Sequence, residues 1–132
     1  MNGKFTHTTE VERVRLPFGE LGWISSPAST NAKQLVVIEG ILTPGFGHNF
    51  HKHPEQEEVF YVIEGEVEQW LEQNKRVLKP GDSVFIPADV VHASFNSSDK
   101  PVKLLAMFAP CVSADGFVSV EMSDQEPWKS LR

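Results

Sequence analysis

The feature of this sequence that most restricts its fold is a series of short apolar segments, each bounded by turn-forming residues. Val, Ile and Phe are frequent in them, and Gly, Pro, Asn or Asp separate them. Such segments are typical of β-strands, and several in succession indicate a sandwich or a barrel. The sequence therefore predicts an all-β chain, with 124–131 as its best helical candidate. The segments are 35–42, 59–63, 67–71, 84–87, 90–95 and 102–109.

Length, charge and cysteine content exclude several classes of protein. The 132 residues suffice for one domain, and the single cysteine, Cys111, excludes an internal disulfide and a Cys-rich zinc site. We interpret Cys111 as a plain thiol without a catalytic role. The formal net charge of −6 predicts no nucleic-acid partner and no anionic membrane surface, because phosphate would repel the chain. No apolar run approaches a membrane span, and the first residues carry no secretory pattern, so we expect a cytoplasmic protein.

Polarity divides the chain into three parts. Residues 34–110 hold the apolar segments, whereas 1–33 and 111–132 are more polar and irregular. We expect a barrel over 34–110, a short N-terminal arm over 1–33, and a C-terminal arm over 111–132 that packs on the barrel.

The segment 59–63 is apolar at every position. In a strand, Phe60 and Val62 face one side, and Val59, Tyr61 and Ile63 face the other. A strand that is apolar on both faces needs cover on both. One face would line the interior of the barrel, and the N-terminal arm or a second subunit would cover the other, which predicts a homodimer.

Three histidines and one glutamate form the candidate reactive centre. His51 and His53 are two residues apart, so a strand points both imidazoles to one face. Glu58 follows a break at Pro54 and can approach from a neighbouring strand, and His92 begins another strand after a turn. Three imidazoles and a carboxylate suit Fe, Ni, Cu or Zn and leave open coordination positions. Spacing alone leaves an alternative open, in which two of these histidines are exposed and the third is a hydrogen-bonded core residue.

Two segments resemble the conserved motifs of the cupin superfamily. Residues 45–65 read GFGHNFHKHPEQEEVFYVIEG and are similar to the first motif at Gly45, His51, His53, Glu58 and Gly65. Residues 81–96 read GDSVFIPADVVHASFN and are similar to the second motif at Gly81, Pro87, His92 and Asn96. Asp89 stands where the family usually has Gly, and Asp tolerates the left-handed backbone that such a turn needs.

This resemblance implies a double-stranded β-helix, or jelly-roll barrel, of the small single-domain type. It also implies one divalent transition metal (Fe, Ni, Mn, Zn or Cu) with four protein ligands. Glu57 is the alternative glutamate, but the spacing to Gly65 favours Glu58. The implied ligands are His51, His53, Glu58 and His92.

Parity along the strands predicts a substrate pocket beside the metal. Phe60 and Val62 share the face of Glu58, and Ser94 shares the face of His92. Gln69 either hydrogen-bonds a ligand in the barrel or lies at a wet edge. His48 precedes His51 by three residues, so a regular strand points it to the opposite face, at the rim or the surface.

The resemblance leaves the reaction open, because cupins include dioxygenases, isomerases, cyclases and non-catalytic ligand binders. We favour a metal-dependent oxidoreductase of the dioxygenase type that acts on a small molecule. Glu58 would be a ligand that shifts to act as a base. The alternatives are a non-redox isomerase or cyclase, in which the metal is a Lewis acid, and a cupin that binds a small ligand without turnover.

Overall fold

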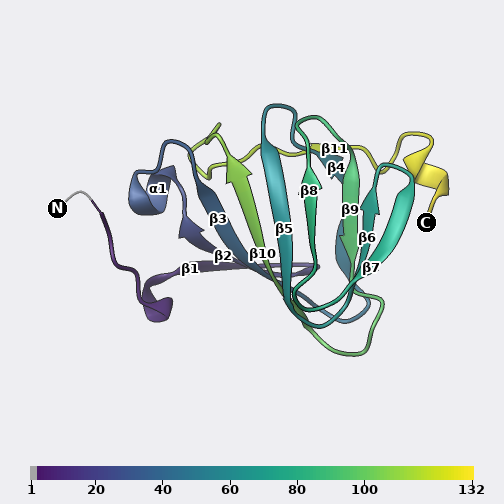
Figure 1. The fold of residues 1–132 in the computed structure, drawn as a ribbon, viewed down its shortest axis with the longest axis horizontal. Helices are drawn as coiled ribbons and strands as arrows, with labels where there is room; N and C mark the ends of the chain where they lie inside the picture. The colour runs from purple at the N-terminus through teal and green to yellow at the C-terminus, as the bar shows by residue number, and fades with distance from the viewer. Residues whose placement is uncertain (1–2) are drawn as a thin grey trace.

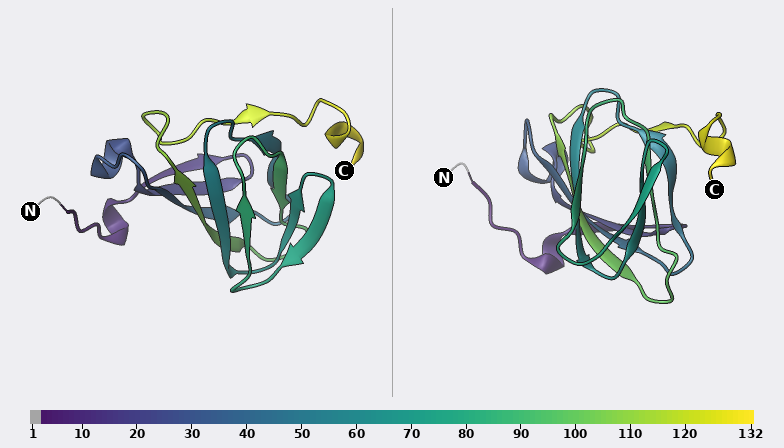
Figure 2. Two further views of the ribbon diagram at one scale, coloured as in Figure 1. Left: turned by 45° about the horizontal axis from the view of Figure 1, so that its top comes forward. Right: turned by 45° about the vertical axis from the view of Figure 1, so that its right-hand side comes forward.

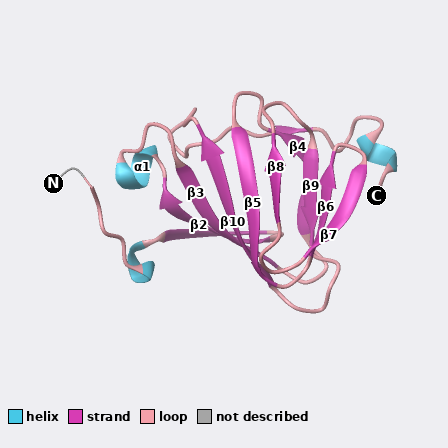
Figure 3. Ribbon diagram, viewed as in Figure 1, coloured by secondary structure: helices cyan, strands magenta, loops and turns pink. Residues whose placement is uncertain are grey.

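A computed structural model describes residues 3–132, and its architecture is two antiparallel sheets that face each other (Figures 1 and 3). The six-stranded sheet has the order β1 (Glu12–Leu16), β2 (Gly19–Ser25), β3 (Val36–Leu42), β10 (Val102–Ala109), β5 (Glu57–Glu64) and β8 (Ser83–Ile86). The five-stranded sheet has the order β11 (Val120–Glu121), β4 (Gly47–Lys52), β9 (His92–Phe95), β6 (Val67–Leu71) and β7 (Asn74–Leu78). The two sheets form the walls of a flattened barrel (Figure 2), which confirms the all-β double-stranded β-helix.

The core lies between the sheets and follows from strand periodicity. Alternate residues of β3 and β10 are buried, as a period of two requires when one face packs inward. Phe60 and Val62 on β5 join this core, as expected from their parity. A second apolar cluster covers the outer face of the five-stranded sheet, where Trp70 packs with Phe50 and with Trp128 of the C-terminal segment.

Two turns contain a residue with a left-handed backbone, Gly81 in one and Asp89 in the other. Lys79 to Asp82 form a turn closed by the Asp82 N–H donating to the Lys79 carbonyl at 2.8 Å, with Gly81 at a φ of 92°. Asp89 lies at a φ of 67°, so it adopts the left-handed conformation in place of the family's Gly.

Both terminal segments contribute strands to the sheets. Residues 12–25 form the β1–β2 hairpin, which extends the six-stranded sheet beside β3. At the other end of the chain, β11 pairs with β4, and the expected helix over 124–131 is reduced to a 3-10 turn, η2 (Trp128–Ser130), because Pro127 interrupts it. The other helices are η1 (Thr8–Glu10) and α1 (Pro27–Thr30). None of the helices within residues 3–132 has the length and apolarity to cross a membrane. The domain boundaries stay a prediction.

The outer face of the six-stranded sheet presents apolar side chains to solvent. Val59 and Tyr61 on β5 and the neighbouring Phe85 on β8 are 37%, 40% and 53% exposed. We therefore still expect a homodimer, which light scattering at micromolar concentration would reveal. Tyr61→Glu should convert it to a monomer, because a charge would be buried at the interface. Val77→Glu is the control, since Val77 is 55% exposed but lies on β7 of the other sheet; a monomeric wild type would contradict the prediction.

Candidate metal centre and cavity

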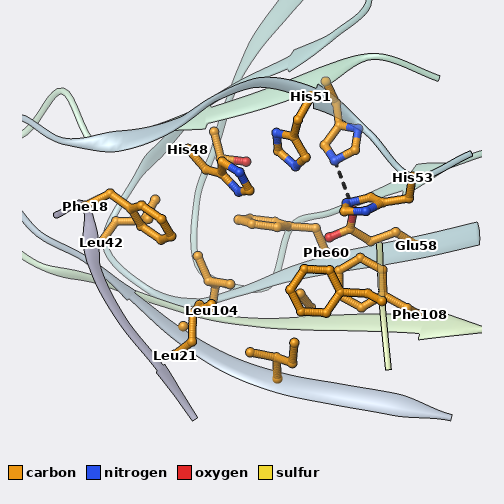
Figure 4. A pocket seen from close by; sticks show the side chains of 16 residues that line it. Phe18, Leu21, Leu42, His48, His51, His53, Glu58, Phe60, Leu104 and Phe108 are labelled. Carbon is orange, nitrogen blue, oxygen red and sulfur yellow. Dashed lines mark ion pairs between the residues drawn. The ribbon is translucent and has the colours of Figure 1, made fainter. Parts of the chain in front are cut away.

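A bulge in β4 directs two histidines into the barrel. His48 pairs with Ser94 and His51 pairs with His92, so three steps along β4 oppose two steps along β9. The extra residue turns His48 to the same face as His51. The expectation that His48 points to the opposite face is therefore wrong, because it assumed a regular strand. The His48 ring stacks on His51 with 3.6 Å between ring centroids, and on Phe18 at 5.2 Å (Figure 4).

The three predicted metal-binding imidazoles share one hydrogen-bonding pattern at Nδ1. The Nδ1 atom of each lies beside a backbone carbonyl, and a carbonyl can only accept, so Nδ1 carries the proton that it donates. In the neutral ring the free lone pair is then on Nε2. Potential ligand atoms of the three rings all lie within 4.8 Å of one another, and all three residues are buried. The pairs are His51 with Asn49 at 2.6 Å, His53 with Val118 at 2.9 Å, and His92 with Val90 at 3.0 Å.

Glu58 reaches the same point from the opposite sheet. Its Oε1 atom lies 3.1 Å from Nε2 of His92 and 3.4 Å from Nε2 of His53. All three atoms are buried, and none has a hydrogen-bond partner. Lone pairs that face one another at these distances repel unless a cation lies between them. These nitrogen and oxygen atoms therefore fit a divalent transition metal. The structure brings together all four residues predicted as ligands. Glu57, the alternative glutamate, is exposed.

The electrostatics of the centre favour neutral imidazoles at His48 and His51 and an ionised carboxylate at Glu58. Burial raises the pKa of Glu58, but the close approach of the His53 and His92 rings outweighs it and lowers the pKa to about 2. Burial, followed by the neighbouring His48, lowers the pKa of His51 well below its ordinary value. Burial, followed by the charge of His92, lowers the pKa of His48 to about 4. His48 and His51 are thus neutral near pH 7, which is the form that binds metal or donates one hydrogen bond.

The metal-binding residues form one end of a cavity that is open to solvent (Figure 4). Phe18, Leu21 and Leu42 form the other end, and His48 lies between the two ends. Of the described residues that line the cavity, none is Lys or Arg, and Glu58 is the one acidic residue. The cavity therefore combines a polar, metal-binding end with an apolar, uncharged remainder, a composition typical of small-molecule sites.

Of the four predicted pocket residues, two line the cavity and two do not. Phe60 and Ser94 line it, as expected. Val62 lies further along β5, packed in the apolar core, so its shared face with Glu58 does not bring it to the cavity. Gln69 is also buried outside the lining, and its Oε1 accepts a hydrogen bond at 2.6 Å from Ser94, its partner on the neighbouring strand. The expectations for Val62 and Gln69 are therefore wrong.

Two walls of the cavity come from residues that the sequence did not indicate. Phe18 lies in the β1–β2 turn, and Phe117 follows the barrel in the C-terminal segment. The Phe117 ring stacks on Phe108 at 5.3 Å and meets His53 edge-on at 5.9 Å. Long-range packing places both rings, so no local spacing could have predicted them.

The metal-free protein should lose stability as the pH falls from about 6.5 to about 4. In the unfolded chain His48 takes up a proton near its ordinary pKa of 6.5, whereas the folded chain holds that pKa at about 4. Between these values the unfolded chain binds more protons, so the free energy of unfolding decreases as the pH decreases. Glu58 adds a second loss between its ordinary pKa of 4.5 and about 2. Urea unfolding across this range measures both losses; a His48→Phe variant with an unchanged slope between pH 6.5 and 4 would contradict the first.

The family model of the cupin domain matches residues 38–108, which include all four converging residues. The chain belongs to the cupin family. It is 42% identical over 72 residues to an uncharacterized protein of Aquifex aeolicus, a match that covers 54% of this chain and 59% of that protein. It is 32% identical over 60 residues to quercetin 2,3-dioxygenase of Bacillus subtilis, covering 46% of this cupin and 18% of the enzyme.

A solved structure confirms the fold. KdgF from Halomonas sp. superposes with a TM-score of 0.73 over 82% of this chain and 94% of its own, at 22% sequence identity. At that identity the likeness shows the architecture, and the reaction has to be argued from the site.

Proposed function

We propose that this cupin binds one divalent transition metal and catalyses the dioxygenase-type oxidation of a small organic molecule. One observation carries the proposal. Potential metal-ligand atoms of His53, Glu58 and His92 are buried without hydrogen-bond partners at the end of an apolar cavity. The partial likeness to quercetin 2,3-dioxygenase supports an oxygen-dependent reaction. When bound, the metal would supply the chemistry that brings substrate and O₂ to react. A dioxygenase places both oxygen atoms in the product, so such a reaction would need no external reductant.

The residues around the metal site orient the imidazoles and supply a negative charge. Backbone carbonyls fix the three imidazoles with Nε2 toward the centre, and Glu58 adds a negative charge from the opposite sheet. A pKa of about 2 suits a permanently ionised ligand. The base role expected for Glu58 requires its carboxylate to swing away from both His53 and His92, because those contacts lower its pKa.

The lining indicates an uncharged, largely apolar substrate with an oxygen at one end. Anionic substrates are usually held by Arg or Lys, and neither lines this cavity. The oxygen would approach the metal-binding end, and the hydrocarbon part would pack against Phe18, Leu21 and Leu42. His48 is placed to contact a polar group of the substrate, because it lines the cavity between its two ends.

Metal analysis of the purified protein, followed by oxygen-uptake assays, tests the proposal. We expect Fe, Ni, Mn or Cu, and O₂ uptake with uncharged aromatic enols or phenols such as quercetin but not with oxalate. Turnover that is equal in the absence of O₂ would indicate a non-redox isomerase or cyclase instead. Saturable binding of these compounds without turnover would indicate a ligand-binding cupin.

A further inference from the structure

Gln56 lies between β4 and β5 and is 1% exposed, yet it does not line the cavity. Both polar atoms of its side-chain amide form hydrogen bonds. Nε2 donates to the Pro110 carbonyl at 2.7 Å and to the Gly116 carbonyl at 2.8 Å, and Oε1 accepts from the Val118 N–H at 3.2 Å. Gln56 thus ties the C-terminal segment 110–118 to the barrel through three hydrogen bonds.

The same segment orients one metal-binding ring. The Val118 carbonyl accepts from Nδ1 of His53 at 2.9 Å, across 65 residues of sequence. His51 and His92 differ, because each donates to a carbonyl only two residues earlier in its own chain segment. Of the three imidazoles, therefore, His53 alone depends on a distant part of the chain for its orientation.

The segment has little freedom to move by itself. Gly116 has a φ of 103°, and a Cβ atom there would lie 2.4 Å from Cγ2 of Val36 in the core. Phe117 packs on Phe108 and on the His53 ring. The segment therefore packs against the core and the His53 ring and is hydrogen-bonded to the Gln56 amide.

We propose that Gln56 is a positioning residue for the metal centre: through Val118 it holds the His53 ring with Nε2 toward Glu58 and His92. This inference rests on the metal site of the proposed function. A hydrogen-bond partner of a metal-binding histidine fixes the ring's orientation, and its loss typically costs about 10- to 100-fold in metal affinity. Gln56 acts one step further out, since it fixes the carbonyl that fixes the ring.

The test compares two variants, in each of which an apolar side chain of similar size replaces a buried amide side chain. Gln56→Met removes the bonds to the C-terminal segment. Asn96→Leu is the control, because Asn96 is also 1% exposed and donates to the Leu42 and Lys100 carbonyls, which orient no ligand. Both variants should lower the melting temperature. Only Gln56→Met should weaken Zn²⁺ or Co²⁺ binding, by about 10-fold or more, and change the visible spectrum of bound Co²⁺.

Each outcome has a distinct meaning. If the wild type binds neither ion, the proposed function fails. If the wild type binds and Gln56→Met retains its affinity and Co²⁺ spectrum, or both variants lose affinity equally, Gln56 is a structural staple and the inference alone is overturned.

Two further measurements apply should Gln56→Met fail to fold. Gly116→Ala disturbs the same segment from the core side and should weaken Co²⁺ binding in the same way. Nitrogen NMR of the wild-type apoprotein should place the His53 proton on Nδ1. A proton on Nε2, or an unchanged Co²⁺ affinity in Gly116→Ala, would overturn the inference.

Discussion

His92→Ala should lower the affinity for a divalent transition metal by at least about 100-fold and leave the barrel folded. The substitution removes one of three converging imidazoles and leaves the Glu58 carboxylate with His53 alone as its close imidazole neighbour. The fold should persist because the apolar core between the sheets does not include His92. Metal content and circular dichroism, measured on the same sample, test both parts.

His7→Ala is the control for this experiment, because His7 is exposed and lies before β1, away from the cavity. It should bind metal as the wild type does. A His92→Ala protein that retains its full metal content but unfolds would show that His92 is a core residue and would refute the ligand assignment.

Gly19→Ala should cost about 3 kcal/mol or more in the free energy of unfolding, the largest stability loss that we expect from a single methyl group. Gly19 begins β2 with a φ of 150°, and a Cβ atom there would lie 1.7 Å from the backbone oxygen of Ile41 on β3. Relief requires the β1–β2 hairpin to move away from β3, and Phe18 and Leu21 would leave the cavity with it. Urea unfolding measures the loss.

Gly45→Ala is the matched control. Gly45 also has a positive φ, 81°, but a Cβ atom there would meet nothing within 4 Å. Its cost should be the backbone strain alone, about 1–2 kcal/mol. Equal losses in the two variants would show that the close approach to β3 at Gly19 relaxes without consequence.

Strands that carry buried apolar side chains could be predicted from the sequence, whereas strands whose side chains are exposed could not. The limits predicted for 67–71 and 102–109 are those of β6 and β10, both rich in buried apolar residues. In contrast, β1 and β7 are polar and mostly exposed, so their strand conformation comes from pairing with a neighbour, which sequence periodicity does not report.

The candidate site divides in the same way. Motif spacing predicted the four residues that converge, three of which lie on the strands β4, β5 and β9. His48 was misplaced because one extra residue in β4 changes the face of every residue before it. Gln56, Phe18 and Phe117 act through contacts with remote segments, so no spacing in the sequence could identify them.

The carbonyls that orient the three imidazoles have a consequence for how this site can change by mutation. The acceptors belong to the main chain of Asn49, Val90 and Val118, and every amino acid carries the same carbonyl. A codon change at any of these positions replaces the side chain and leaves the acceptor in place. A single substitution at one of these three residues therefore leaves the orientation of the ring unchanged. Only a mutation that moves the backbone there would change it.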